Sequence, residues 1–234
     1  RGRHIGYFEA HIEQGRSLET SGLKVGVVTS IVGIWQYVVT FTGEQNHAGT
    51  TAMAVRKDAG LALAKFCVAI DQAFPKACGP RTVWTTGRIT LDPGAPSIIP
   101  GRAVMMFQIR DDDVAVIARL ETLLREMAAE ATAQGPCGVT VKNIRVGAPA
   151  HMDPRFQAAI EAASGAVGGG RHTRMPSAAG HDAQILSTVM PAAMMFVPSI
   201  NGISHHWTEN TDDADIVTGA EVFVDACARM LRGA

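Results

Sequence analysis

The order of predicted elements between residues 35 and 146 restricts the fold of this chain more than any other feature. Apolar and polar residues alternate from Trp35 to Thr42, which predicts a half-buried strand. Apolar residues at three- and four-residue spacing then predict a helix that ends at Pro75. Further along, the patterns predict strands over 83–91 and 103–110, a helix capped by Asp111 to Asp113, and a strand over 139–146. This order predicts a ferredoxin-like module, with two helices on one face of a four-stranded antiparallel sheet.

The residues on either side of the module indicate an α/β domain that the module interrupts. Asp153-Pro154 is typical of a helix start, and the apolar run 192–197 predicts a strand buried on both faces. Thr218 and Glu221 have the spacing of a capping box, which predicts the start of a closing helix. We therefore expect residues 1–34 and 147–234 to form parts of one domain.

Charge and cysteine content exclude several classes of function. The 21 Lys and Arg residues nearly balance the 22 Asp and Glu residues, so neither nucleic acid nor an anionic membrane is an expected partner. No apolar stretch approaches the roughly 18 residues of a membrane span. The four cysteines form no C-x-x-C pair, which favours a reducing, cytoplasmic location. The chain opens with Arg1 and runs within a few residues into strand-like sequence, so we expect the true N-terminus to be missing.

Four histidines lie in local sequences rich in small polar or acidic residues. They are His11 in EAHIEQG, His47 in GEQNHAGTT, His181 in AAGHDAQ and His205 in NGISHHWTEN. A single loop histidine is more often a surface residue than a ligand, but four in such settings favour a functional site. Spacing alone assigns no metal, and the absence of an H-E-x-x-H pair excludes a helix-borne zinc protease site.

Five segments of the chain, in order, resemble the amidase and carbamoylase family of two-metal hydrolases. They are EAHIEQGRSLE, GEQNHAGTTAM, PGAPSIIPG with the following FQIRD, PSAAGHDAQ, and FVPSINGISHHWTEN. The family includes N-carbamoyl-L-amino-acid hydrolases, allantoate amidohydrolases and β-ureidopropionases, within the aminopeptidase-like metallohydrolases. The resemblance implies an α/β fold: a partial aminopeptidase-like catalytic domain, residues 1–34 and 147–234, with an inserted ferredoxin-like α+β dimerisation (lid) module, residues 35–146.

The resemblance implies that His11 and His205 are metal ligands, with His206 as the alternative to His205. A complete active site would hold two metal ions, for which neutral imidazoles suit Zn²⁺, with Mn²⁺, Co²⁺ or Ni²⁺ as alternatives. Both histidines could meet only if they lie at strand ends of one sheet. The alternative for His11 is a structural hydrogen bond at a buried strand end.

His47 matches a catalytic and substrate-binding histidine that the family supplies across a homodimer to the scissile carbonyl oxygen. Its alternative role is to cap a helix beginning after Ala52. Arg110 matches the arginine that binds the substrate carboxylate, a task suited to a bidentate donor. Its alternative is an exposed strand-end residue paired with Asp111 or Asp112.

Three further positions, Gln14, Ser97 and Gly180, match substrate-binding positions of the family. Ser97 is a departure, because the family usually has Asn there, and a hydroxyl lacks the separate donor and acceptor of an amide. Gln108 stands where Asp is common, and Ala178 replaces a usual glycine.

The family site also requires an upstream His, a bridging Asp and a Glu-Glu pair, and none of these precedes His11. Glu9 and Glu13 cannot simply take those roles. Because a two-metal mechanism needs a bridging water and a base, we expect this chain alone not to catalyse the reaction.

The resulting hypothesis is a metal-dependent amidohydrolase that cleaves a carbamoyl or ureido C–N bond of a small carboxylate substrate, such as an N-carbamoyl-L-amino acid. Three alternatives stay open: an allantoate amidohydrolase, a metallopeptidase or acylase of the same fold, and a catalytically incomplete dimerising fragment.

Overall fold

The computed structural model describes residues 4–233, which fold into a mixed α/β architecture. The chain divides into two compact units, Arg1–Val32 with Pro149–Ala234, and Gly33–Ala148. Across the described residues, no helix has both the length and the apolar character that crossing a bilayer requires. We call the two parts the discontinuous unit and the inserted unit, and describe each by itself.

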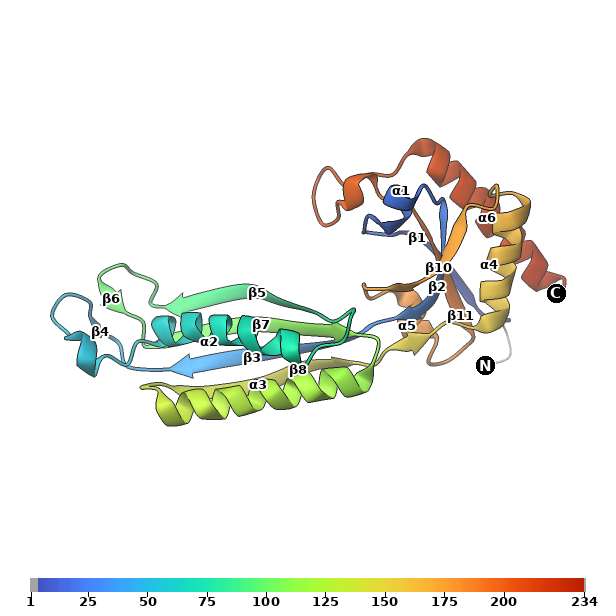
Figure 1. The fold of residues 1–234 in the computed structure, drawn as a ribbon. Coiled ribbons are helices and arrows are strands. Elements are labelled where there is room, and N and C mark those ends of the chain that lie inside the picture. The colour runs from blue at the N-terminus through green and yellow to red at the C-terminus, as the bar shows by residue number, and fades with distance from the viewer. Residues whose placement is uncertain (1–3, 234) are drawn as a thin grey trace. The chain divides into compact units, whose positions relative to one another are not determined.

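The discontinuous unit is built on a five-stranded mixed sheet (Figure 1). Its strand order is β1 (Tyr7–Ile12), β11 (Ala192–Val197), β2 (Val25–Ile31) and β10 (His172–Ser177), and β9 (Ala150–His151) also pairs with β2. β1 runs parallel to β11, whereas β11 and β2 are antiparallel. Every residue of β11 is buried, because this strand lies between two others and under helices.

The helices of this unit are α1 (Ser17–Ser21), α4 (Pro154–Ala166), α5 (Asp182–Leu186) and α6 (Asp213–Leu231), with a 3₁₀ turn at η3 (Ile200–Gly202). Two long helices, α4 and α6, pack against each other and against the sheet. The predicted capping box at Thr218 is wrong, because α6 begins at Asp213 and the side chain of Asp212 caps it by accepting from Ala214 N–H. Thr218 lies inside the helix, where its hydroxyl donates to the Ala214 carbonyl over 2.8 Å.

The inserted unit has the predicted order of strands and helices. Its elements are β3 (Gly33–Thr42), α2 (Ala59–Ala73), β5 (Val83–Asp92), β7 (Arg102–Asp111), α3 (Val114–Gln134) and β8 (Gly138–Gly147), which form an antiparallel sheet in the order β5-β7-β3-β8. Between them lie the short strands β4 (Asn46–His47) and β6 (Ile98–Ile99) and the 3₁₀ turns η1 (Met53–Val55) and η2 (Phe74–Lys76). The α/β class is thus confirmed, whereas a role for this unit as a lid or dimerisation module stays a prediction.

The sheet of the inserted unit has two different faces. Alternate residues of β3 and β7, such as Tyr37, Phe41 and Phe107, are buried in the core beneath α2 and α3. The intervening residues, such as Gln36 and Gln108, point to the opposite face and are only partly buried. We call this opposite side the open face.

Candidate metal and substrate site

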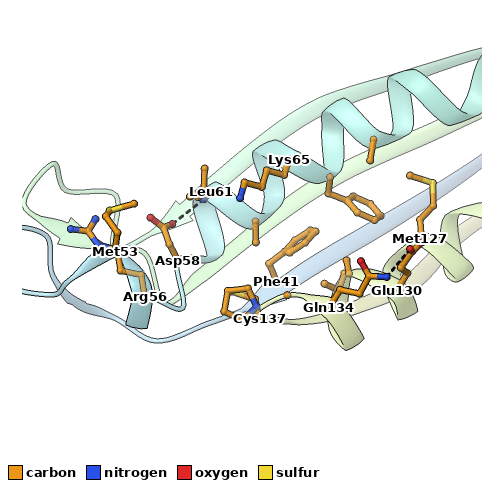
Figure 2. A pocket seen from close by; sticks show the side chains of 17 residues that line it. Phe41, Met53, Arg56, Asp58, Leu61, Lys65, Met127, Glu130, Gln134 and Cys137 are labelled. Carbon is orange, nitrogen blue, oxygen red and sulfur yellow. Dashed lines mark hydrogen bonds between the residues drawn. The ribbon is translucent and has the colours of Figure 1, made fainter.

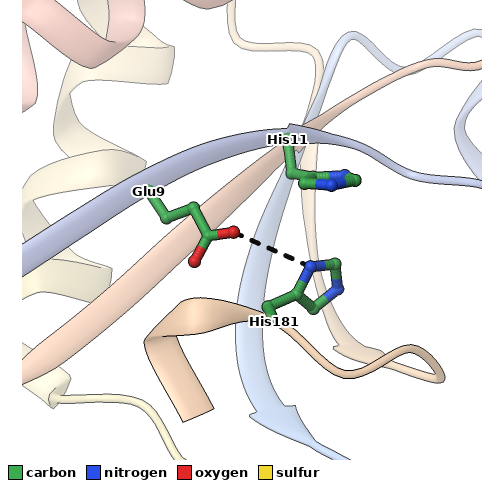
Figure 3. Close-up of side chains that lie close together, drawn as sticks. All are labelled: Glu9, His11 and His181. Atoms are coloured by element: carbon green, nitrogen blue, oxygen red, sulfur yellow. Dashed lines mark ion pairs between the residues drawn. The ribbon is translucent and has the colours of Figure 1, made fainter. Parts of the chain in front are cut away.

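Strand alternation places Glu9 and His11 on the same side of β1. The neighbouring residue Phe8 points to the opposite side, where its ring stacks on Phe223 of α6 with ring centroids 4.4 Å apart. The even-numbered residues of β1 therefore face the long helices. Glu9 and His11 therefore project to the other side of the sheet. There they meet His181, which immediately precedes α5 (Figure 3).

Glu9, His11 and His181 form a compact group of potential metal ligands. One ligand atom from each residue lies within 4.8 Å of the other two, and the rings of His11 and His181 are 4.7 Å apart. The Nδ1 atom of His11 lies 2.8 Å from the carbonyl oxygen of Ile12. Because a carbonyl can only accept, Nδ1 carries the proton and Nε2 presents a lone pair suited to a metal.

His181 is oriented by a hydrogen bond at one ring nitrogen, and its other ring nitrogen faces Glu9. Its Nε2 lies 2.8 Å from the hydroxyl oxygen of Ser177, and its Nδ1 lies 3.8 Å from a Glu9 oxygen. Burial, followed by the neighbouring His11, lowers the pKa of His181 from its ordinary value to about 4. The ring is therefore neutral near pH 7, and its approach to Glu9, dashed in Figure 3, is not an ion pair at that pH.

Glu9 is itself held in place by the start of α5. Its second carboxylate oxygen accepts a 2.8 Å hydrogen bond from the backbone N–H of Ala183. Two imidazoles and one carboxylate are a donor set that zinc sites use, so the chemistry of these residues fits a divalent metal. His11, with its oriented Nε2, is the member best prepared to bind one.

His205 lies in the loop that follows β11, and β11 is the parallel neighbour of β1. His11 is opposite Phe196 in the register, so the loop leaves the sheet next to the end of β1. His205 has a positive φ of 56°, and its backbone N–H donates to a Glu209 carboxylate oxygen over 2.8 Å. This bond is the main reason why the pKa of Glu209 is lowered, and the charges of His205 and His11 add to it. Both predicted metal ligands thus contribute to lowering the pKa of Glu209.

Gln14 connects the end of β1 to the loop of His205. Its side-chain amide donates to the hydroxyl of Ser204 over 2.8 Å, and its backbone N–H donates to the hydroxyl of Ser199 over 3.0 Å. The discontinuous unit thus brings Gln14 next to the residue that precedes His205. Gly180, the remaining predicted position of this unit, directly precedes His181.

Glu13 and His206 have local structural roles. The two carboxylate oxygens of Glu13 accept from the backbone N–H groups of Ser17 and Leu18, each over 2.8 Å, at the start of α1. His206 is exposed, and its Nδ1 lies 2.8 Å from the hydroxyl of Thr208.

His47 and Ser97 lie side by side in the inserted unit, where β4 pairs with β6. The N–H of Ala48 donates to the Ser97 carbonyl over 2.9 Å. The Nδ1 atom of His47 accepts from the N–H groups of Gly49 and Thr50, at 3.0 and 3.2 Å, so the ring proton is on Nε2. An exposed Nε2–H is the donor that a substrate carbonyl requires.

The alternative that His47 caps a helix is wrong. The element that begins after Ala52 is the 3₁₀ turn η1, and no side chain caps it. The helix α2 begins only at Ala59, and the side chain of Asp58 caps it by accepting from Leu61 N–H. His47 instead closes the turn that follows β4.

Arg110 lies near the end of β7 on the open face. Its Nε donates to the side-chain oxygen of Gln108 over 2.6 Å. Its two aspartate neighbours are engaged elsewhere, Asp111 by the hydroxyl of Thr82 and Asp112 by Arg81. Burial, followed by the charge of Arg145, lowers the pKa of Arg110.

Two cavities lie in the inserted unit. Arg110 borders the smaller one, of about 200 Å³, which is lined by Gln36, Thr85, Gly87, Met106, Phe107, Gln108 and Arg110. The larger, of about 650 Å³, opens beside the helices α2 and α3 and is lined by residues such as Phe41, Leu61 and Met127 (Figure 2). None of the predicted site residues lines the larger cavity, so its size does not make it the candidate site.

The sequence patterns assigned no role to Glu9, Glu209 or Arg145. They singled out His181 as one of four histidines in settings that favour a functional site, but did not name it as a metal ligand. Glu9 could have been paired with His11, because residues two apart on a strand share a face. No sequence pattern predicts the contact between His181 and Glu9, because the contact depends on how the chain returns across the sheet after β10.

Comparison with known proteins assigns the family. The model of the peptidase family M20/M25/M40 matches residues 1–229. The allantoate amidohydrolase of Escherichia coli (strain K12) is 34% identical over 222 residues, covering 92% of this chain and 52% of that protein. The N-carbamoyl-L-amino-acid amidohydrolase of Rhizobium meliloti is 30% identical over 220 residues, covering 94% and 52%. This chain therefore spans about half the length of the curated relatives it matches.

A solved structure agrees with these relatives. An amidase of the hydantoinase/carbamoylase family from Burkholderia phymatum is 42% identical and superposes with a TM-score of 0.85, covering 98% of this chain and 55% of that one. The resemblance drawn from the five sequence segments is thus confirmed. The chain belongs to the peptidase family M20/M25/M40.

Proposed function

We propose that this chain forms part of a metal-dependent amidohydrolase that cleaves a carbamoyl or ureido C–N bond of a small carboxylate substrate, such as an N-carbamoyl-L-amino acid or allantoate. The observation that carries the proposal is His11, whose protonated Nδ1 leaves Nε2 directed for metal binding beside Glu9 and His181. The similarity to an allantoate amidohydrolase and an N-carbamoyl-L-amino-acid amidohydrolase supports this substrate class.

The metal would be held by His11 and His205, together with ligands from outside this chain. Zinc suits the imidazole donors, with manganese, cobalt or nickel as alternatives, and two ions would occupy a complete site. A bound divalent metal would polarise the substrate carbonyl and lower the pKa of a water molecule. The neutral His181 and the anchored Glu9 support His11 from the same side of the sheet.

The other predicted residues bind and orient the substrate. The Nε2–H of His47 donates to the carbonyl oxygen, where negative charge develops during attack. Arg110 pairs with the substrate carboxylate, and its guanidinium is oriented by Gln108. Gln14 fixes the loop of His205, and Ser97 and Gly180 lie beside His47 and His181 for substrate contacts.

The dimensions of the inserted unit support a homodimer with shared sites. Eight residues of an antiparallel strand separate Arg102 from Arg110, a span of about 27 Å. The loop with His47 lies beyond the Arg102 end, since Gly43 N–H bonds to the Gly101 carbonyl over 2.8 Å (Figure 1). One small substrate cannot touch His47 and Arg110 of the same inserted unit, so we infer that a second copy, joined through residues 35–146, supplies His47.

A cytoplasmic location is part of the same proposal. It rests on the wide separation of the cysteines in the sequence. All four of them, Cys67, Cys78, Cys137 and Cys227, are free thiols in the structure.

The test is an assay of the protein together with the segment that supplies the remaining metal ligands, loaded in turn with Zn²⁺, Mn²⁺, Co²⁺ and Ni²⁺. Release of ammonia is measured with N-carbamoyl-L-amino acids, allantoate and N-carbamoyl-β-alanine. Release of free amino acids from dipeptides and N-acyl amino acids is measured in parallel. We expect ureido substrates to be hydrolysed and His11→Ala to abolish both bound metal and activity. His205→Ala should behave in the same way, whereas His206→Ala serves as its matched control. Hydrolysis of peptides alone would overturn the proposal.

A further inference from the structure

The two segments that carry the predicted metal ligands both contain left-handed backbone. Among residues 4–233, the non-glycine residues with a positive φ are Gln14 at 58°, Asn201 at 56° and His205 at 56°. Gln14 lies three residues after His11, and the other two lie in the loop between β11 and α6. Because a Cβ atom makes this conformation unfavourable, it persists only where neighbouring groups hold it.

A chain of hydrogen bonds joins these two segments and ends on Glu209. The side-chain amide of Gln14 donates to the hydroxyl of Ser204 over 2.8 Å. That hydroxyl in turn donates to the Glu209 carboxylate. Because a hydroxyl accepts and donates at the same time, the three groups form one directed chain from the amide to the carboxylate.

The same carboxylate also holds the backbone of His205. One of its oxygens accepts from the His205 N–H over 2.8 Å, so Glu209 binds two consecutive residues of the loop. The backbone around Glu209 is held in turn. Its own N–H donates to the His206 carbonyl over 2.9 Å, and the next residue, Asn210, accepts from the N–H of Ile200 over 2.9 Å. Glu209 therefore supports the left-handed turn at His205 from a fixed position.

The stability of the fold does not account for this contact. Glu209 and His205 are both exposed, and a hydrogen bond between exposed groups contributes little to folding because water competes for it. What the bond does fix is the conformation of the His205 backbone, and with it the direction in which the side chain leaves the loop.

We propose that Glu209 is a positioning residue that sets the direction of the His205 side chain for metal binding, with Ser204 and Gln14 linking it to the strand of His11. The inference rests on the proposed function, which makes His205 a metal ligand. A ligand atom must lie within about 0.2 Å of its ideal distance from the metal, so a turn that relaxes to a commoner φ would misplace the imidazole. Glu209 acts through His205 and is not itself a ligand.

The experiment measures the affinity for Zn²⁺ by competition with a chromophoric chelator, using the protein together with the segment that supplies the remaining metal ligands. Glu209→Ala removes both contacts, whereas Glu209→Gln keeps a side-chain oxygen at the same reach without the charge. The matched control is Glu19→Ala, because the Glu19 carboxylate accepts from the N–H of Asn201, the other left-handed residue of this loop, over 3.0 Å. Denaturation in the presence of a chelator reports the stability of each variant without metal.

We expect Glu209→Ala to weaken the binding of one of the two zinc ions about tenfold, as the loss of an outer partner of a ligand does at other metal sites. Glu209→Gln should restore most of this affinity, because its amide oxygen still accepts from the His205 N–H. Glu19→Ala should bind zinc like the unmodified protein, and the stability of Glu209→Ala without metal should be unchanged.

Three results would overturn the positioning role. The first is an unchanged zinc affinity in Glu209→Ala. The second is an equal loss in Glu209→Gln, because the charge itself would then be required, as it is for a direct ligand. The third is an equal loss in Glu19→Ala, because any support of the loop would then suffice.

Ammonia release from ureido substrates separates this inference from the proposed function. Turnover by the unmodified protein, with an unchanged zinc affinity in Glu209→Ala, contradicts the positioning role and leaves the proposed function standing. A loss of zinc affinity in Glu209→Ala that Glu209→Gln restores, in a protein that hydrolyses no ureido substrate, supports the positioning role and contradicts the proposed function.

Discussion

At the scale of single residues, the buried imidazole of His181 makes the stability of the chain depend on pH. Its side chain is 2% exposed, and its pKa falls from 6.5 to about 4 in the folded chain. Between these values the unfolded chain binds a proton that the folded chain does not. The free energy of unfolding should therefore decrease as the pH falls from about 6.5 to about 4, by about 3 kcal/mol from this residue.

Chemical denaturation at a series of pH values measures this dependence, with a chelator present because metal bound at His11 would add its own dependence on pH. His181→Gln keeps a polar side chain beside Ser177 without a titrating ring. The slope of stability against pH should be smaller in this variant by about one proton. Parallel curves for the two proteins would show that His181 titrates normally in the folded chain.

The residue scale also shows where prediction from sequence ends. The bond between Gln108 and Arg110 follows from strand alternation, because residues two apart share a face. The nearness of Arg145 to Arg110 could not be derived in this way. It depends on the register between β3 and β8, which shifts at a bulge between Gln36 and Tyr37.

At the scale of elements, the packing of α6 on β11 depends on a glycine inside the helix. A Cβ atom at Gly219 would lie 2.3 Å from a methyl carbon of Val197, so no larger residue fits without movement. Replacing a helical glycine by alanine normally stabilises a helix by roughly 1 kcal/mol. We expect Gly219→Ala instead to lower the free energy of unfolding by about 1–3 kcal/mol through overpacking.

Gly165 in α4 provides the matched control, because a Cβ there would meet no atom within 4 Å. Gly165→Ala should raise the free energy of unfolding by up to about 1 kcal/mol. Adding Val197→Ala to Gly219→Ala should recover part of the loss in a double-mutant cycle. If both glycine variants were stabilised equally, the close packing of α6 on β11 would be contradicted.

The starts of the helices show which sequence patterns were enough to predict a helix start. Asp113 and Asp153 were predicted to start helices and do so, each accepting from a backbone N–H two residues later. The capping-box spacing of Thr218 and Glu221 was misleading, because Asp212 had already capped the helix six residues earlier. Spacing alone does not distinguish a cap from the same residue pair in a helix interior, where Thr218 satisfies its hydroxyl on a preceding carbonyl.

At the scale of the whole molecule, the order of helices and strands was predictable, because each element has its own local spacing of apolar residues. The arrangement of the site residues was not predictable in this way. The loop that carries His205 leaves the sheet beside the end of β1 because β1 and β11 pair in parallel, a pairing between segments far apart in sequence. The proposed role of His11 and His205 came from the resemblance, since no local pattern specifies that pairing. The same holds for the second copy that would bring His47 to Arg110.

Shared sites in a homodimer lead to a test by complementation. In the protein assayed together with the segment that supplies the remaining metal ligands, His47→Ala and Arg110→Gln should each abolish activity when either variant is present alone. In a dimer that contains one chain of each variant, one site combines both defects and the other is intact. Random exchange of subunits makes half of the dimers mixed, and one of the two sites in each mixed dimer is intact. The mixture should therefore recover roughly a quarter of the activity of the unmodified protein.

The control mixes His47→Ala with a chain that carries both His47→Ala and Arg110→Gln. No dimer in that mixture contains an intact site, so it should stay inactive. Analytical ultracentrifugation of each variant checks that dimers still form, and subunit exchange is followed with two labelled chains. If subunits exchange but the first mixture recovers no activity, shared sites are contradicted. His47 and Arg110 of one chain would then have to act on one substrate. The span of about 27 Å along β7 does not permit this without rearrangement of the inserted unit.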